Sequence, residues 1–335
     1  MNKRLILIEA IYSLLVLFQI LFYPALVGIA IVRYFQKWFK PNRSPHSLFG
    51  EVALITGSGR GLGRDIAITL AKHGCHIAIV DIQDNLAKET AKYITEKYGV
   101  KTKAYTVDVQ DYQQLLNLQK NVTSDLGDVT ILVNNAGILT LSSIENPPAD
   151  EVQRMINVNL TAPVLTTQIF LPKIKELNRG YIINISSISA MYPSPFYNVY
   201  AATKSALCHL TSSLRIDLLQ SKSNVKAITV CPSFLTTNKR VLELLKVLKI
   251  VNILANLNGQ DVAECILEAM LRGDDELTLP RPFLLFSRLM APLPVYVVEK
   301  LTATFTKNLN TFINCNELSQ ILKADDVPMH VESNK

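Results

Sequence analysis

From Glu51 onwards, short apolar runs alternate with longer amphipathic stretches. The runs are apolar throughout rather than at every second position, as in strands that are covered on both faces. This alternation predicts an α/β fold, a doubly wound parallel sheet with helices on both sides. The expected strands are 52–56, 76–81, 102–108, 131–134, 180–184 and 226–231, and the expected helices are 63–73, 85–98, 111–126, 149–178 and 199–220.

A glycine-rich loop follows the first expected strand and opens the first expected helix. Residues 56–63 read TGSGRGLG. Glycines let the backbone turn tightly and approach a pyrophosphate, and a helix N-terminus presents free N–H groups and partial positive charge. Between a strand and a helix, the loop predicts the dinucleotide site of a Rossmann fold rather than a plain turn. The cofactor-binding residues expected here are Gly57, Ser58, Arg60, Gly61, Leu62 and Gly63.

The choice between NAD and NADP depends on two side chains. Asp81 ends the second expected strand, where a carboxylate binds the adenosine ribose 2′-OH and repels a 2′-phosphate. Arg60 is a cation that could pair with that phosphate. Asp81 faces the 2′ position more directly, so we expect NAD, with NADP as the alternative. Asp108 and Val109 are expected at the adenine, although Asp108 could instead cap the helix near Asp111.

Tyr200 and Lys204 lie four residues apart in a helical stretch, and that spacing places them on one face. A nearby ammonium stabilises a phenolate, so we expect the pKa of Tyr200 to be lowered. Such a phenol could exchange a proton with an alcohol or carbonyl oxygen at neutral pH. Ser187 follows an apolar strand and could hold the same oxygen. The alternative is an ordinary surface pair.

These motifs together resemble the short-chain dehydrogenase/reductase family over residues 51–280. The matching segments, in order, are 56–63, 134–137, 157–159, 186–187, 200–204 and 232–237. The resemblance implies Tyr200 as the acid/base, Ser187 (alternatively Ser186) as the substrate-binding hydroxyl, and Lys204 on the nicotinamide ribose. It also implies that Asn159 interrupts its helix and holds a relay water. The remaining implied cofactor contacts are Asn135 and Thr237. One departure is Ser233, which stands where the family usually has glycine.

Within the family, the layout resembles the membrane-bound retinol and 17-beta-hydroxysteroid dehydrogenase group. That likeness implies a lipid alcohol such as a retinoid or steroid as substrate, and the endoplasmic reticulum membrane or lipid droplets as location. It also implies a homodimer formed through the helices at 149–178 and 199–220. The expected function is therefore NAD-dependent interconversion of a lipophilic alcohol and its carbonyl. The alternatives are an NADPH-dependent lipid carbonyl reductase and a non-catalytic lipid-droplet scaffold.

Residues 1–32 form a long apolar N-terminal segment in which Glu9 is the only acidic residue. As a helix, residues 5–32 would be about 42 Å long, more than the ~30 Å hydrocarbon core. We expect a membrane anchor, either tilted or bent at Pro24, rather than a cleaved signal peptide. Basic residues are more numerous after the segment than before it, which predicts that the catalytic domain lies in the cytosol. Residues 33–50 read as a basic linker.

The C-terminal extension, 281–335, is expected to associate with the membrane or cover the site. Its apolar stretches at 283–290 and 293–298 could lie in an interface or pack as core helices. Residues 242–257 could form a substrate lid or an ordinary packed helix.

Net charge is +6, but no basic helix with interleaved aromatics appears, so no nucleic-acid partner is expected. The five cysteines and five histidines lack metal-ligand spacing, so no metal is expected.

Overall fold

The computed structural model describes residues 48–140, 148–192, 197–233, 235, 257–291 and 293–310, and parts of 9–32. The chain divides into two compact units, Met1–Pro45 and His46–Lys335. In the first unit the described residues are helical and expose large apolar side chains such as Leu14, Phe18 and Leu21. Among the residues described, no helix combines the length and the apolar character needed to cross a membrane.

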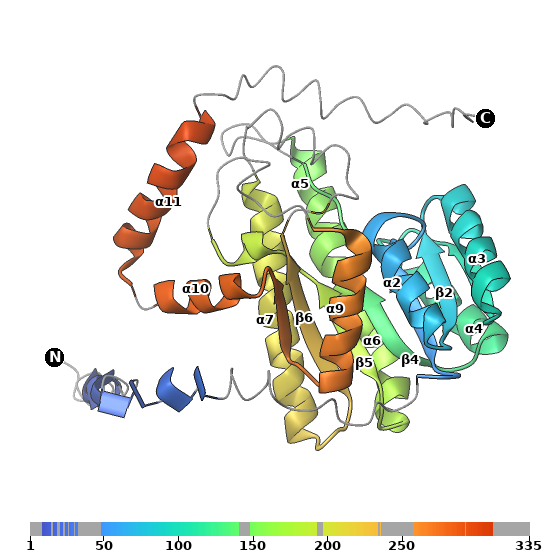
Figure 1. The fold of residues 1–335 in the computed structure, drawn as a ribbon, viewed down its shortest axis with the longest axis horizontal. Coiled ribbons are helices and arrows are strands. Elements are labelled where there is room, and N and C mark those ends of the chain that lie inside the picture. The colour runs from blue at the N-terminus through green and yellow to red at the C-terminus, as the bar shows by residue number, and fades with distance from the viewer. Residues whose placement is uncertain are drawn as a thin grey trace. The chain divides into compact units, whose positions relative to one another are not determined.

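The second unit is built on one seven-stranded sheet, in which every paired strand is parallel (Figure 1). The strand order is β3-β2-β1-β4-β5-β6-β7, so the chain winds outward from β1 in one direction and from β4 in the other. The predicted doubly wound parallel sheet is confirmed. The strands are β1 (Val52–Thr56), β2 (His76–Asp81), β3 (Thr102–Thr106), β4 (Val129–Asn134), β5 (Tyr181–Ile185), β6 (Lys226–Pro232) and β7 (Glu276–Leu279).

Helices cover both faces of the sheet, and each face has its own buried apolar cluster. Alternate residues of β1 point to opposite sides: Ala53 and Ile55 join one cluster, while Val52 and Leu54 join the other. The first face carries α2 (Gly61–Lys72), α3 (Asp84–Tyr98) and α9 (Gly259–Arg272), with α2 and α9 side by side in Figure 1. The second carries α4 (Tyr112–Asp125), α6 (Ala162–Glu176) and α7 (Asn198–Gln220).

Two parts of the fold differ from the sequence-based expectation. The stretch expected as one helix is α5 (Ala149–Ile156), a π-helical turn at Asn157–Thr161, and then α6. Helix α9 and the edge strand β7 were missed. Helix α9 is capped by Asn258, whose side chain accepts a hydrogen bond from the Gln260 N–H at 2.9 Å. The last strand of the sheet is therefore added after the region where a lid was expected.

The apolar C-terminal stretch forms two helices, α10 (Pro282–Met290) and α11 (Val295–Asn310). No residue of α10 is buried, and Phe286 and Leu289 are 48% and 53% exposed. The alternative of a core-packing helix is therefore wrong for α10. The described start of α11 also exposes Val295 and Tyr296.

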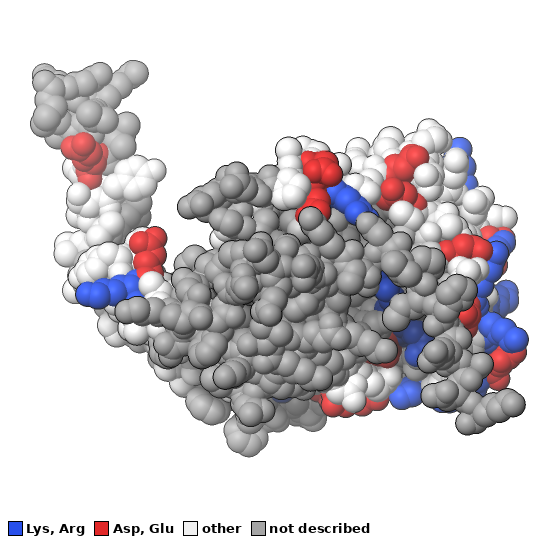
Figure 2. Space-filling model, turned by 90° about the horizontal axis from the view of Figure 1, so that it is seen from above, with Lys and Arg blue, Asp and Glu red and all other residues white. Residues whose placement is uncertain are grey.

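Charged side chains of both signs are interspersed over the described part of the face in Figure 2. Ion pairs on the described surface include Lys88 with Asp84 at 2.7 Å and Lys103 with Asp125 at 2.7 Å. Exposed pairs of this kind contribute at most about 1 kcal/mol. The surface charge therefore does little to position the site, which depends on the buried contacts described next.

Candidate active site

The glycine-rich loop connects β1 to α2 at the carboxyl edge of the sheet. Gly57 and Gly61 have φ angles of +64° and +58°, which L-residues with side chains rarely adopt. A Cβ on Gly59 would lie 2.9 Å from Asp81 Oδ2, and one on Gly63 would collide with the Gly57 carbonyl oxygen. Gly57 and Gly61 therefore suit glycine because of their backbone conformation, whereas a side chain at Gly59 or Gly63 would collide with Asp81 or with the loop backbone.

Helix α2 begins at this loop with no side chain capping its first N–H groups, since Arg60 makes no capping hydrogen bond. Uncapped N–H groups and the helix dipole make such a terminus an anion site. Leu62 and Gly63 are buried beneath it, and Arg60 is exposed. The loop therefore fits a dinucleotide pyrophosphate, as expected from the sequence.

Ser58 has a structural role in this loop. Its hydroxyl donates to the Ile55 carbonyl at 2.7 Å and accepts from the Val80 N–H at 3.0 Å, and the side chain is fully buried. The Ser58 N–H also donates to the Val80 carbonyl at 3.2 Å. Ser58 thus ties the loop to β2. Its expected contribution to cofactor binding is to hold the loop in shape.

Asp81 lies at the end of β2 and is fixed by the loop. Its Oδ2 accepts from the Gly59 N–H at 2.9 Å, and its Oδ1 accepts from the Gln83 N–H at 3.0 Å. Each carboxylate oxygen keeps lone pairs for a further donor. The carboxylate is therefore held in a fixed position beside the glycine loop.

Asp108 lies two residues beyond the end of β3, which stops at Thr106 rather than at Asp108 as expected. It accepts from the Gln110 N–H at 3.0 Å, whereas Asp111 caps α4 by accepting from the Gln114 N–H at 3.0 Å. Asp111, and not Asp108, therefore caps the helix. Next to Asp108, Val109 is buried.

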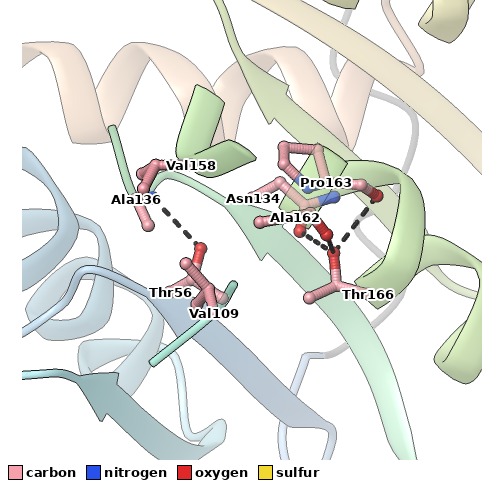
Figure 3. A pocket seen from close by; sticks show the side chains of 8 residues that line it. All are labelled: Thr56, Val109, Asn134, Ala136, Val158, Ala162, Pro163 and Thr166. Atoms are coloured by element: carbon pink, nitrogen blue, oxygen red, sulfur yellow. Dashed lines mark hydrogen bonds between the residues drawn. The ribbon is translucent and has the colours of Figure 1, made fainter. Parts of the chain in front are cut away.

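A small pocket lies behind the ends of β1 and β4 (Figure 3). It leaves essentially no room even for a water molecule, far less than the roughly 300–1,000 Å³ of a typical ligand site. Its lining residues are Thr56, Val109, Asn134, Ala136, Val158, Ala162, Pro163 and Thr166. This pocket is therefore part of the packing beneath the site, not the site itself.

Polar contacts lock β4 to its neighbours around this pocket. The Thr56 hydroxyl oxygen accepts from the N–H groups of Asn135 and Ala136 at 3.0 and 3.1 Å. The Asn135 side-chain amide donates to the carbonyls of Thr56 and Gly57 at 2.9 and 3.0 Å. Asn135 therefore holds the glycine loop against β4, at the position where the chain changes its winding direction.

Asn159 is fully buried in the π-helical turn between α5 and α6. Its Oδ1 accepts from the Ile138 N–H at 2.8 Å, and its amide donates to the Ile138 carbonyl at 2.9 Å and to Thr203 at 3.3 Å. π-Turns break the regular i→i−4 ladder and occur often at functional sites. The turn thus interrupts the helix where expected, and Asn159 links it to α7.

Two adjacent serines at the end of β5 have different environments. Ser186 is buried, and its hydroxyl donates to the Lys204 carbonyl at 2.8 Å. Ser187 is partly exposed, accepts from the Ser189 N–H at 3.2 Å, and hydrogen-bonds the Tyr200 phenol. Ser186 is committed to the backbone of α7, so the geometry favours Ser187 as the hydroxyl that meets a substrate.

Helix α7 presents Tyr200 and Lys204 at the same edge of the sheet. The Lys204 Nζ donates to the Ile185 carbonyl at 2.8 Å and lies 5.7 Å from the centroid of the Tyr200 ring. A Cβ on Gly137 would lie 3.4 Å from both Lys204 Nζ and Asn159 Oδ1. The structure therefore brings Asn159, Ser187, Tyr200 and Lys204 together, beside the end of β4.

The expected lowering of the Tyr200 pKa is wrong for the chain without a cofactor. Burial raises the pKa of Tyr200 to about 12, although the hydrogen bond from Ser187 opposes this shift. Burial also lowers the pKa of Lys204 to about 8. Desolvation disfavours the charged form of each group and is the largest cause of both shifts. At neutral pH the phenol is therefore protonated and can donate.

Tyr192, five residues after Ser187 in the sequence, forms an aromatic cluster with Phe283 and Phe286 of α10. The Tyr192 ring lies 5.3 Å from Phe283 and 5.8 Å from Phe286, centroid to centroid. The Tyr192 hydroxyl and the Ser189 hydroxyl are buried and have no hydrogen-bond partner among the described residues. Such groups normally have a partner, so water or a ligand oxygen is expected there. Sequence reasoning missed this cluster.

Thr237 and residues 242–256 of the expected lid lie outside the described residues. Leu257, at the end of that stretch, pairs with Leu235 in an isolated parallel bridge. Its position brings the two ends of the intervening segment together beside β6.

A parallel α/β sheet with a glycine loop and a Ser–Tyr–Lys cluster defines a nucleotide-dependent oxidoreductase. Residues 51–243 match the family described as short chain dehydrogenase. The chain belongs to this family and is an oxidoreductase.

Several curated relatives share this family. The chain is 31% identical to short-chain dehydrogenase/reductase family 16C member 6 of Bos taurus, covering 84% of this chain and 88% of the relative. It is 32% identical to estradiol 17-beta-dehydrogenase 11 of Homo sapiens, over 66% and 73% of the two chains. It is also 32% identical to epidermal retinol dehydrogenase 2 of Mus musculus, over 59% and 63%. The predicted resemblance is confirmed.

Solved structures show the same fold. A dehydrogenase from Burkholderia phymatum in complex with NAD matches with a TM-score of 0.66 and 23% identity, over 72% of this chain and 93% of that one. L-sorbose reductase from Gluconobacter frateurii, complexed with NADPH and L-sorbose, matches with a TM-score of 0.63 and 25% identity, over 69% and 95%. The expectation of a nicotinamide cofactor, NAD or alternatively NADP, agrees with these complexes.

Proposed function

We propose that this chain interconverts a lipophilic alcohol and its carbonyl compound with NAD, and that Tyr200 moves the proton. The observation that carries the proposal is the cluster of Ser187, Tyr200 and Lys204 at the sheet edge, beside the glycine loop. When bound, the nicotinamide ring supplies or takes the hydride. The residues of the chain then have to orient the substrate oxygen and exchange its proton.

Each residue of the cluster has a separate part in that exchange. Ser187 donates a hydrogen bond that orients the substrate oxygen toward Tyr200. Tyr200 gives its proton to a forming alkoxide during reduction, or takes the alcohol proton during oxidation. Lys204, which donates to the Ile185 carbonyl, would hold a ribose hydroxyl and favour the phenolate. Asn159 keeps the π-turn against α7, where a water could join the proton path.

The cofactor preference follows from Asp81. Its negative charge beside the glycine loop repels a 2′-phosphate, while its free lone pairs suit the ribose diol of NAD. The glycine loop, Asn135 and the N-terminus of α2 would hold the pyrophosphate. We place Asp108 and Val109 near the adenine, and Thr237 near the carboxamide, as the family resemblance implies.

A lipophilic substrate is supported by the aromatic cluster and by the relatives. Tyr192, Phe283 and Phe286 pack together as an aromatic cluster, and Tyr192 is close to Ser187 in the sequence. Two of the relatives are named for estradiol and retinol, which are both lipid alcohols. We infer that the substrate's apolar body lies against this cluster while its reacting oxygen reaches Ser187 and Tyr200.

We also propose that residues 1–32 anchor the chain at the endoplasmic reticulum membrane or a lipid droplet, with 33–50 as a basic linker. Catalytic residues would then lie within 51–280 on the cytosolic side, with 281–335 touching the membrane. An anchor raises the local concentration of a membrane-dissolved substrate. The exposed apolar residues Val164 on α6 and Ile216 and Leu219 on α7 support the homodimer expected through these helices.

A substrate comparison tests the proposal. Full-length protein in mild detergent is supplied with NAD and with retinol, estradiol or sorbitol, and NADH formation is followed. The proposal predicts turnover of at least one lipid alcohol and a much lower kcat/KM for sorbitol. Preference for the sugar alcohol would contradict the lipophilic assignment. The absence of turnover with every alcohol and with the matching carbonyls and NADH or NADPH would contradict the enzymatic one.

An NADPH-dependent lipid carbonyl reductase is the second candidate. Arg60 is exposed in the loop next to Gly59 and could pair with a 2′-phosphate, and the protonated Tyr200 suits reduction. Measured dissociation constants for NADH and NADPH separate the two candidates. Tighter binding of NADPH would favour the reductase, and tighter binding of NADH would favour the NAD enzyme.

A further inference from the structure

Cys208 and Cys231 lie in contact beneath the candidate active site. Their sulfur atoms are 3.7 Å apart, although 23 positions separate them in the sequence. Cys208 lies on α7, one helical turn after Lys204, and Cys231 lies on β6. The fold alone brings the two thiols together, because they come from different elements.

The pair is connected to Lys204 through Ser186. The Cys208 thiol donates to the Ser186 hydroxyl at 3.1 Å, and that hydroxyl donates to the Lys204 carbonyl at 2.8 Å. Movement of the Cys208 sulfur would therefore disturb a hydrogen bond on the turn of α7 that carries Lys204.

The two thiols differ in accessibility. Cys231 is fully buried, whereas Cys208 is partly exposed. Hydrogen bonding from Cys231, together with Ser186 and the nearby Lys204 cation, holds the pKa of Cys208 below its usual range. Burial raises the pKa of Cys75 to about 12 and also raises that of Cys265. Of the four cysteines that the structure describes, Cys208 is thus the one suited to react as a thiolate.

We propose that Cys208 and Cys231 form a site of reversible oxidation that closes a disulfide between α7 and β6 and weakens cofactor binding. An accessible thiolate beside a resolving thiol is the arrangement of oxidation-sensitive cysteines. The Cys208 thiolate attacks a peroxide, which yields the Cys208 sulfenic acid and hydroxide. The Cys231 thiol then attacks that sulfur, which forms the disulfide and releases water. The two thiols are oxidised, and the peroxide is reduced to water and hydroxide.

Closure changes the geometry at Lys204. The sulfur atoms must approach from 3.7 Å to about 2 Å. Cys208 is then drawn toward β6, its hydrogen bond to Ser186 is lost, and the turn that holds Lys204 shifts. Loss of one hydrogen bond from a charged group lowers NADH affinity by about tenfold or more. This effect rests on the role proposed for Lys204 above, whereas formation of the disulfide does not.

Peroxide treatment of the full-length protein in mild detergent tests both steps. After excess peroxide is removed, titratable thiols are counted, and a non-reducing digest is analysed by mass spectrometry. The proposal predicts the loss of two thiols, a peptide pair linking Cys208 to Cys231, and NADH affinity reduced about tenfold. Dithiothreitol should restore both thiols and affinity.

Three variants make the result specific. Cys208→Ser and Cys231→Ala should each lose the linked peptide pair and keep NADH affinity after peroxide. Cys265→Ala, at another partly exposed cysteine, should behave as the unmodified chain does. No linked pair, a different pair, or a linked pair with unchanged NADH affinity would each overturn the proposal. Failure of the alcohol assay alone would contradict the proposed function and leave this result standing.

Discussion

The Lys204 ammonium donates a hydrogen bond of 2.8 Å to the Ile185 carbonyl oxygen at the end of β5. Lys204 is only 4% exposed, and among the described residues it forms no ion pair. A buried cation without a carboxylate is costly, which is why burial lowers the pKa of Lys204 to about 8. Such a cost is typical of a group that is kept for function rather than for stability.

Lys204→Met is therefore expected to increase stability. The shift from 10.5 to about 8 destabilises the folded chain by up to about 3 kcal/mol at pH 7, less the cost of an unpaired Ile185 carbonyl. Below pH 8 the lysine is charged in both states and the cost is complete. Between pH 8 and 10.5 the cost disappears. Denaturant unfolding at pH 7 and pH 10 should show an advantage of the variant that shrinks with pH; a less stable variant at pH 7 would contradict this.

The pH dependence of turnover should differ between the two directions. Reduction needs the Tyr200 phenol, which stays protonated below its pKa of about 12, and the Lys204 cation, which is lost above about 8. Reduction should therefore be constant at neutral pH and fall above about 8. Oxidation needs the phenolate, so its kcat/KM should rise with pH through the neutral range. An oxidation profile already level at pH 7 would show that Tyr200 titrates much lower.

Asp81→Asn tests the origin of cofactor preference. The amide oxygen can still accept from the Gly59 N–H, which keeps the contact to the glycine loop, while the hydrogen bond from the Gln83 N–H is lost. Removing the negative charge should lower the preference for NADH over NADPH by roughly tenfold to a hundredfold. Dissociation constants for both cofactors measure this ratio. If the ratio does not change, Asp81 does not face the 2′ position.

Phe286→Ala tests the aromatic surface. Phe286 is 48% exposed, so its truncation should leave the fold intact. Loss of apolar contact should raise KM for a lipid alcohol about tenfold. Leu289→Ala, on the same helix and 53% exposed, is the matched control and should have little effect. Equal KM values for the two variants would show that the aromatic cluster does not contact the substrate.

Much of the fold could be predicted because the central strands β1, β2 and β4 are almost wholly apolar and buried. The missed edge strand β7 is short and contains Glu276 and Thr278, so it lacks that pattern. Helix α9 did carry a signal: Asn258 caps its start, and Gly273, with φ of +68°, ends it. These two residues together are the start and stop signals of a helix.

The candidate site was predictable where spacing alone determines proximity, as for Tyr200 and Lys204 on one helix face. The upward shift of the Tyr200 pKa could not be predicted, because the burial that causes it depends on the complete fold. The choice between Ser186 and Ser187 also needed the structure, which shows Ser186 bonded to α7. The contact between Cys208 and Cys231 joins a helix to a strand and has no local sequence signature.

Turnover by Tyr200→Phe measures the central claim most directly. The variant keeps the ring but removes the proton that Tyr200 exchanges, so kcat should fall about 10²- to 10⁴-fold. Tyr93→Phe, which removes a phenol hydroxyl on α3 bonded to Lys97, should keep full turnover. A Tyr200→Phe protein with the kcat of the unmodified chain would contradict the assignment of Tyr200 as the acid/base.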